Sequence, residues 1–432
     1  MKMANMDDYF DVVIVGTGAA GLYCALNLPA RYRILLLTKQ KADESDSFLA
    51  QGGICMQHGE ADYRPFFDDT MRAGHYENNP ATVDLMIRSS NSIIRDLVRR
   101  GVRFARDDHG ALRFTREGAH SRPRILFHED ITGHEITQTL LNEVLRCENI
   151  ELREHTTLLD FFADASACGG VIAAGPDGEP RAIGAGAVVL ACGGIGGLYK
   201  NSTNFPHITG DAIAMALRHS VACEHLDYIQ IHPTTLYSHR KGRRFLISES
   251  VRGEGALLLD KNGNRFTNEL QPRDVVSAAI RAQMEKDGTD HVWEDMRPIG
   301  EAAIREHFPN ILERCEEEGY DPIHEPIPVV PAQHYFMGGI TADLSSRTAL
   351  PRLYACGETC CNGVHGRNRL ASNSLLESLV FAQRAADDIL YGEPPVFTGD
   401  KPDLAPYREQ EPLFAAYRQE VLTAIERSKN HE

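Results

Sequence analysis

The chain has 432 residues, too many for one hydrophobic core, so its length predicts two or three domains. Hydrophobic residues make up 42% and charged residues 25%, as in an ordinary globular protein, and the formal charge of −16 excludes nucleic acid and anionic membranes as main partners. The sequence lacks a signal-peptide pattern, a run of about 18 apolar residues and zinc-ligand cysteine spacing, so we expect a cytoplasmic protein with reduced thiols, no membrane span and no metal.

The first elements predict a β-turn-α-β unit. Residues 11–15, DVVIV, form a β-branched run that is typical of a buried parallel strand. The glycine-rich segment GTGAAG and an apolar helix that ends before Pro29 come next, and residues 33–38, RILLLT, predict the second strand. Helical spacing follows at residues 82–100 and again from His134.

The middle of the chain has a different character. Strand-like pieces lie between residues 151 and 186, and a further buried strand begins at Ala187. The segment LLLDKNGNRF indicates a hairpin that turns at Asn262 and Gly263, and a helix is expected to begin at Pro272. This change of pattern indicates an inserted domain.

Buried strands and glycines return in GGITADL and RLYACGE, and two more helices follow. The simplest architecture is α/β and discontinuous, with one nucleotide-binding domain formed by residues 1–225 and 337–395. We expect an inserted α+β domain at residues 226–336 and a C-terminal extension at residues 396–432.

Gly16, Gly18 and Gly21 form the pattern GxGxxG between a predicted strand and a predicted helix. The first glycine permits a tight turn, the second lets the backbone approach a pyrophosphate, and the third permits close packing of helix on strand. The N-terminus of the helix then offers free N–H groups to the phosphates. The pattern therefore predicts a bound dinucleotide.

The choice between NAD and FAD depends on residues farther along the chain. No acidic residue follows the second strand, which ends at Thr38 and Lys39. Asp211 in TGD and Glu358 in CGE place carboxylates beside glycines, where the ribityl chain of a flavin could be bound. A second glycine-rich segment, CGGIGG, has the wrong spacing for a nicotinamide nucleotide. These features favour FAD, with electrons taken from the substrate or from a partner.

Seven motifs together resemble, in order and spacing, those of the succinate dehydrogenase/fumarate reductase flavoprotein family. They are SDSFLAQGGI, QIHPTTLY, SESVRGEGALLL, QPRDVV, PAQHYFMGGI, LYACGE and GVHGRNRLASNSLLE. The resemblance runs from about residue 9 to residue 390 and implies an FAD-binding Rossmann-like domain with an inserted α+β capping domain. Many relatives in one branch have a further helical C-terminal domain, and we expect this chain to lack that full domain because it ends at Glu432.

Two local features imply a branch within this family. Succinate dehydrogenases attach FAD to a histidine at the place that Asp46 or Ser47 occupies here, so the resemblance implies non-covalent FAD. The segment TREGAHS, from Thr115 to Ser121, resembles the branch that oxidises L-aspartate to iminoaspartate, with O2 (giving H2O2) or fumarate as acceptor. That reaction opens NAD biosynthesis, and its labile product implies hand-over to quinolinate synthase. The alternatives are a soluble fumarate reductase or succinate-oxidising flavoprotein, and a flavoprotein that binds dicarboxylates without catalysis.

Glu117, within TREGAHS, distinguishes these alternatives by charge. A cationic pocket binds the two carboxylates of aspartate or succinate but repels the ammonium group that only aspartate carries. One glutamate near C2 would restore the balance, and its charge-assisted hydrogen bond contributes on the order of 1.5–3 kcal/mol. Without the resemblance, an exposed loop glutamate paired with Arg116 or Arg122 would be the simpler interpretation.

The resemblance implies catalytic roles for Arg273, Glu117, His232, His334 and Arg369. Arg369 offers a planar fork of donors to one carboxylate, and the two imidazoles can donate to the other. Arg273 matches the arginine that shuttles a proton in fumarate reduction. A pKa of about 12.5 or above makes an arginine a poor base, so a role through charge alone is the alternative. A pairing of Arg273 with Asp274 or Glu269 at the helix start would be purely structural.

Further residues are assigned to substrate and cofactor by the same resemblance. Gln230 and Ser372 are expected to contact the substrate. The residues expected to bind FAD are Gly16, Thr17, Gly18, Ala19, Ala20, Gly21, Lys39, Ser47, Phe48, Leu49, Ala50, Gln51, Gly52, Gly53, Asp211, Glu358, Asn373, Ser374 and Leu375.

Overall fold

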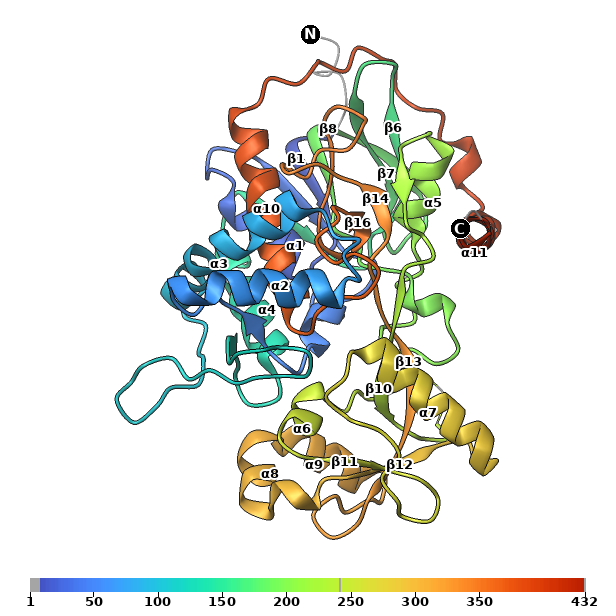
Figure 1. The fold of residues 1–432 in the computed structure, drawn as a ribbon. Helices are drawn as coiled ribbons and strands as arrows, with labels where there is room; N and C mark the ends of the chain where they lie inside the picture. The colour runs from blue at the N-terminus through green and yellow to red at the C-terminus, as the bar shows by residue number, and fades with distance from the viewer. Residues whose placement is uncertain (1–7, 241, 431–432) are drawn as a thin grey trace.

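The computed structural model describes residues 8–240 and 242–430. Its largest sheet has seven strands in the order β5-β2-β1-β8-β7-β6, with β15 paired to β8 (Figure 1). Pairing around β1 is parallel, whereas β7 joins β8 and β6 antiparallel. The strands are β1 (Tyr9–Val15), β2 (Ile34–Leu37), β5 (Ile150–Arg153), β6 (Thr157–Ala163), β7 (Cys168–Ala174), β8 (Pro180–Leu190) and β15 (Leu353–Ala355).

The buried strand β1 needs cover on both faces, because successive side chains of a strand point to opposite sides. Val12 and Ile14 belong to one hydrophobic core, and Val13 and Val15 belong to a second. The helices over the first core are α1 (Ala19–Asn27), α2 (Tyr63–Ala73), α3 (Pro80–Arg100), α4 (Thr132–Val144) and α10 (Asn373–Tyr391). The helices over the second are α5 (Asp211–Arg218) and α11 (Gln410–Lys429).

A second unit lies below this sheet in Figure 1 and has a hydrophobic core of its own. Its antiparallel sheet has the order β10-β13-β12-β11, with β10 (Ile229–Leu236), β11 (Leu257–Leu259), β12 (Val292–Asp295) and β13 (Ile327–Phe336). Its helices are α6 (Glu249–Gly253), α7 (Arg273–Asp287), α8 (Glu301–His307) and α9 (Pro309–Glu317). β10 and β13 carry the chain between the two units (Figure 1). The residue limits that we expect for the domains stay predictions.

Short strands complete the frame around the junction. β9 (Cys223–Glu224), β14 (Gly339–Thr341) and β16 (Cys360–Cys361) form a three-stranded sheet, and β3 (Ile54–Cys55) pairs with β4 (Ile125–Leu126). Each of the ten cysteines is a free thiol. Within the described part of the chain, no helix has the length and apolar character needed to cross a membrane.

The main elements expected from the sequence are present, with two instructive differences. The hairpin at Asn262 and Gly263 does turn there, with Gly263 at φ 81°, but its returning arm makes only the bridge between Leu259 and Arg265. The sequence pattern did not predict α6, α8 or α9, nor α2, which has Pro65 as its third residue. Proline is tolerated in the first turn of a helix because no intrahelical partner exists there for the missing N–H.

Asp130 joins the two units through the start of α9. Its carboxylate accepts hydrogen bonds from the Ile311 N–H at 2.8 Å and the Asn310 side chain at 2.6 Å. The side chain is buried, and burial raises its pKa despite these bonds. A residue of one unit thus satisfies backbone donors at the N-terminus of a helix in the other.

We expect Asp130→Ala to lower the free energy of unfolding by about 1–3 kcal/mol, because buried donors lose their acceptor. Chemical denaturation of the FAD-loaded protein measures the change. Asp130→Asn keeps one acceptor oxygen and should lose less, and Asp43→Ala, at an exposed position, is the matched control. An Asp130→Ala protein as stable as the control would contradict this role.

Candidate active site

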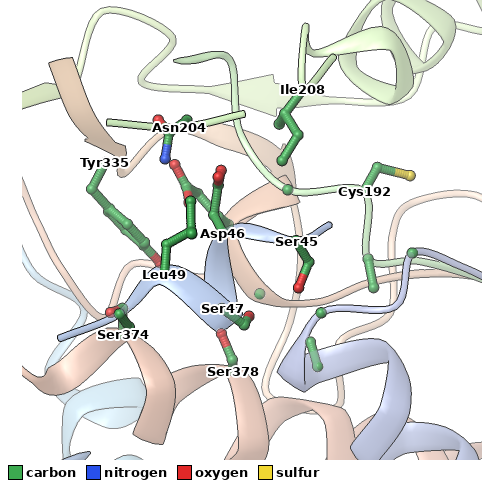
Figure 2. A pocket seen from close by; sticks show the side chains of 18 of the residues that line it. Ser45, Asp46, Ser47, Leu49, Cys192, Asn204, Ile208, Tyr335, Ser374 and Ser378 are labelled. Carbon is green, nitrogen blue, oxygen red and sulfur yellow. The ribbon is translucent and has the colours of Figure 1, made fainter. Parts of the chain in front are cut away.

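One long cavity extends from the turn between β1 and α1 to the junction of the two units, and its empty volume, including the open mouth, is about 1700 Å³. Its wall is built from segments that are distant in sequence. Figure 2 shows the side chains of Ser45, Asp46, Ser47 and Leu49, of Cys192, Asn204 and Ile208, and of Ser374 and Ser378 around the same space. The expected residues on the wall are Gly16, Thr17, Gly18, Ala20, Lys39, Ser47, Leu49, Ala50, Gln51, Gly52, Gly53, Glu117, Asp211, Arg273, His334, Glu358, Arg369, Ser372, Ser374 and Leu375.

The glycine-rich turn brings backbone rather than side chains to one end of this cavity. Gly16 has φ 114°, and a Cβ atom there would lie 2.0 Å from the Ala191 carbonyl oxygen. A Cβ atom at Gly21 would lie 1.9 Å from the Gly16 carbonyl oxygen, so neither position admits a side chain. Gly18 caps α1, whose N-terminus therefore faces the cavity with its positive dipole end. This end is suited to a pyrophosphate.

Polar groups along the next part of the wall suit the hydroxyl groups and polar atoms of a flavin nucleotide. Lys39 Nζ lies 2.6 Å from Asp211 Oδ2, so these two expected ligands form an ion pair on the cavity wall. Glu358 accepts a hydrogen bond from the Phe336 N–H at 2.9 Å, and burial raises its pKa well above the usual range, with Asp46 adding to the effect.

Asp46 is one of the two residues, with Ser47, expected at the place of the covalent histidine of succinate dehydrogenases. Its Oδ1 accepts a hydrogen bond from the Phe205 N–H at 2.9 Å, while its buried Oδ2 has no partner within residues 8–240 and 242–430. Burial raises the pKa of Asp46 to about 7. A buried oxygen without a partner is costly, and a polar ligand in the cavity would satisfy it. The glycine turn, the ion pair and this oxygen together fit FAD.

Two arginines mark the other end of the cavity. Arg369 Nη1 donates to Ser374 Oγ at 2.9 Å, its guanidinium lies 4.4 Å from the centre of the Tyr335 ring, and its buried Nε has no partner in the described chain. Burial, followed by repulsion from Arg273, lowers the pKa of Arg369 to about 10. The side chain stays cationic at neutral pH, with donor capacity for a carboxylate.

Arg273, the first residue of α7, is held by two side chains from the capping unit. Its Nε donates to Glu249 Oε2 at 2.5 Å and its Nη1 to Gln230 Oε1 at 2.9 Å. The structural pairing with Asp274 or Glu269 considered from the sequence is therefore not the one that forms. Arg273 instead reaches the cavity wall with a carboxylate partner.

Glu249 is the main site residue that sequence reasoning missed. It lies on the cavity wall at the start of α6, and Arg273 and Arg252 lower its pKa against the opposing effect of burial. Its motif, SESVRGEG, was quoted for the family resemblance, but a glutamate next to two serines and near an arginine carries no local sign of a catalytic position. Only the folded arrangement brings it to Arg273.

Glu117 is buried on the wall, not exposed in a loop. Its Oε1 accepts from Ser250 Oγ at 2.9 Å and its Oε2 from Ser372 Oγ at 2.6 Å. Burial and the nearby Glu249 raise its pKa, while the Ser372 bond and the charge of Arg273 act in the opposite direction. The expected alternative of an exposed glutamate paired with Arg116 or Arg122 is thus wrong, since the carboxylate bonds two hydroxyl groups inside the protein.

The two histidines of the expected clamp lie together, with ring centres 5.1 Å apart. His334 lies on the wall with Nδ1 2.7 Å from Thr203 Oγ1. His232 is fully buried behind it, with Nδ1 2.9 Å from the Thr234 carbonyl oxygen and no partner for Nε2 in the described chain. Burial and Arg273 lower the pKa of both rings well below the usual value, so both are neutral at neutral pH.

Six expected site residues lie off the cavity wall: Ala19, Gly21, Phe48, Gln230, His232 and Asn373. Gln230 is the informative one. Its amide NH2 donates to Asn368 Oδ1 and to the Arg369 carbonyl oxygen, both at 2.8 Å, while its oxygen accepts from Arg273. The side chain therefore links the two arginines, and a positioning role fits this better than direct substrate contact.

The chain is similar to known FAD-dependent proteins over most of its length. A family model described as an FAD binding domain matches residues 11–375. The L-aspartate oxidase of Clostridium perfringens is 48% identical over 380 residues, which cover 88% of this chain and 86% of that protein. The L-aspartate oxidase of a Nostoc species is 44% identical, with 98% of this chain and 76% of that protein covered. A solved variant of E. coli quinol fumarate reductase FrdA is 31% identical, with a TM-score of 0.83 and coverage of 95% of this chain and 74% of that one.

Gly52→Ala tests the packing around Glu117. A Cβ atom at Gly52 would lie 2.3 Å from Glu117 Oε1 and 3.4 Å from Ser372 Oγ, so the carboxylate must move and weaken its hydroxyl bonds. We expect the free energy of unfolding to fall by about 1–3 kcal/mol. Gly175→Ala is the control, because its Cβ atom would meet nothing closer than 3.8 Å. Equal stability of the two variants in denaturant titrations would contradict the close contact.

Proposed function

The chain belongs to the FAD-binding flavoprotein family of succinate dehydrogenase and fumarate reductase, and from this premise we infer that it oxidises L-aspartate to iminoaspartate. The observation that carries this proposal is the setting of Glu117. This carboxylate is buried on the same cavity wall as Arg273 and Arg369 yet bonds only the hydroxyl groups of Ser250 and Ser372 in the described structure. An ammonium group placed there would supply the missing positive charge.

The charges of the wall match a zwitterionic dicarboxylate. Arg369 and Arg273 are cationic and can each receive a carboxylate, whereas His334, also on the wall, is neutral and can donate without adding charge. Glu249 is already matched by Arg273. Glu117 therefore remains as the partner for the α-ammonium group, and the C2–H bond between these groups is held in one orientation.

Oxidation at C2 removes two electrons as hydride and one proton from the ammonium group. FAD held by the cavity wall would supply the hydride acceptor, and its reoxidation would use O2, giving H2O2, or fumarate, giving succinate. A carboxylate with a raised pKa is better matched to accept the ammonium proton than an ordinary glutamate, so Glu117 is suited to both binding and proton removal. Arg273 keeps its charge throughout and holds a carboxylate.

We also propose that FAD is held without a covalent link, because Asp46 and Ser47 cannot form the histidine bond. Iminoaspartate hydrolyses readily, so direct transfer to a quinolinate synthase would make this reaction the opening step of NAD biosynthesis. The free thiols are consistent with the reducing cytoplasm.

Anaerobic titration of the FAD-loaded protein tests the proposed substrate. We expect L-aspartate to bleach the flavin absorbance near stoichiometrically, and succinate to leave it oxidised. A soluble fumarate reductase, the alternative supported by the likeness to FrdA, would give the reverse result. Bleaching by succinate and not by aspartate would end the proposal.

The pH dependence of binding tests the role of Glu117. The ammonium group pairs with the ionised carboxylate, so the affinity for L-aspartate should fall as the pH drops through the pKa of Glu117, which is raised above 4.5. The affinity for succinate should rise over the same pH range, because protonation removes the negative charge that repels it. Glu117→Gln should remove both transitions and weaken aspartate binding roughly tenfold to a hundredfold.

Flavin absorbance titrations with L-aspartate analogues and succinate at several pH values measure these affinities. Glu179→Gln, at an exposed position of the turn before β8, is the matched control. An equal loss of affinity for both ligands in Glu117→Gln would show a purely structural role.

A further inference from the structure

His120 lies in the same turn as Glu117 but off the cavity wall, and its two ring nitrogens have different partners. Nδ1 is 2.8 Å from Nη1 of Arg124, and Nε2 is 3.0 Å from the Ala371 carbonyl oxygen. A guanidinium can only donate, so Nδ1 must accept and Nε2 must carry the proton. Burial and the charge of Arg124 lower the pKa of His120 to about 4, which keeps this neutral form at neutral pH.

The ring contacts a buried cluster of ion pairs formed by Arg124, Asp62 and Asp69. Arg124 is fully buried, with Nη2 2.9 Å from Asp62 and Nη1 2.8 Å from Asp69. Asp69 also accepts bonds from the N–H and the hydroxyl of Ser121, at 2.7 and 2.6 Å. This ion-pair cluster therefore fixes both His120 and Ser121.

The other partner of His120 is the carbonyl group of Ala371, which is adjacent in the chain to Ser372 on the cavity wall. Ala371 precedes Ser372, which has the left-handed φ of 61° that non-glycine residues rarely adopt. The Ser372 carbonyl accepts from the Cys55 N–H at 3.0 Å, and its hydroxyl donates to Glu117 Oε2. The Ala371 carbonyl has only the Cys55 thiol, at 3.6 Å, as a further donor in the described chain. His120 thus supplies the main bond to one of the two peptide groups that set the strained conformation.

We infer that His120 is a positioning residue that holds the 371–372 loop so that the Ser372 hydroxyl meets Glu117, and thereby sets the preference for a substrate amino group. The inference rests on the proposed oxidation of L-aspartate. His120 and Glu117 hold the same loop from one turn, so the carboxylate and its hydroxyl donor are aligned by a single local structure.

Steady-state kinetics of His120→Ala and His120→Gln test this role. Without the imidazole, the loop loses its main bond, and we expect KM for L-aspartate to rise roughly fivefold to a hundredfold with a smaller change in kcat. Glutamine offers one acceptor for Arg124 and one donor for the Ala371 carbonyl, so His120→Gln should restore most of the loss. FAD affinity should stay within about twofold, and so should inhibition by succinate at a pH well above the transition of Glu117, where the carboxylate is ionised in both proteins.

A double-variant comparison separates positioning from general damage. In a Glu117→Gln background, His120→Ala should add no further rise in KM, because the interaction that it supports is already lost. An additive effect, an unchanged KM in His120→Ala, or an equal loss of FAD and succinate affinity would each overturn the inference.

A second readout does not need turnover of aspartate. Ser372 lowers the pKa of Glu117, while Glu249 and Arg273 also face it and are unchanged in the variant. His120→Ala should therefore shift the pH transition in succinate binding, measured by flavin absorbance, upward. If aspartate fails to reduce the wild-type flavin, the proposed substrate is wrong, and an unmoved transition in this second measurement would separately overturn the role of His120.

Discussion

A buried carboxylate that forms no ion pair in the described chain is the constraint around which this site is organised. Water no longer solvates Glu117, and two serine hydroxyls compensate only part of the cost of its charge. Glu249, by contrast, is matched by Arg273 within the protein. The difference between two neighbouring glutamates, one paired and one not, gives the cavity its selectivity, because the unpaired one gains most from a ligand that brings its own positive charge.

The fold makes this arrangement possible by bringing distant segments to one cavity. The glycine-rich turn after β1 opens one end, the capping unit supplies Glu249 and Arg273 at the other, and the N-terminus of α10 adds Ser372, Ser374 and Leu375. Each side chain is fixed by contacts outside the cavity. Gln230 links Arg273 to the Arg369 backbone. His120 links the 371–372 loop to the buried ion-pair cluster of Arg124, Asp62 and Asp69. Preorganisation of this kind keeps charged groups in place without help from the ligand.

The sequence predicted the parts of the fold that short-range physics determines. Residues 12–15 are β-branched and precede three spaced glycines, a pattern that indicates a strand followed by a tight turn and a helix. α2 was not predicted because Pro65 interrupts the helical pattern of its sequence. Pro65 lies in the first turn of the helix, where a proline costs no intrahelical hydrogen bond. Family resemblance located the arginines and Glu117, but burial and pairing are long-range properties. Sequence alone therefore neither revealed Glu249 as the partner of Arg273 nor placed His232 and Gln230 behind the wall.

The junction between the two units has a mechanical consequence. Both crossings of the chain run through the ribbon formed by β10 and β13, and register shifts interrupt that ribbon next to Gln230 and His232. A two-stranded ribbon resists stretching, since its hydrogen bonds would break, but it twists easily, and an irregularity in the ladder concentrates the bending. A swing of the capping unit about this irregularity would break the contact of Asp130 with α9 and carry Arg273 away from Arg369, so the two arginines can receive one ligand together only while the two units are in contact.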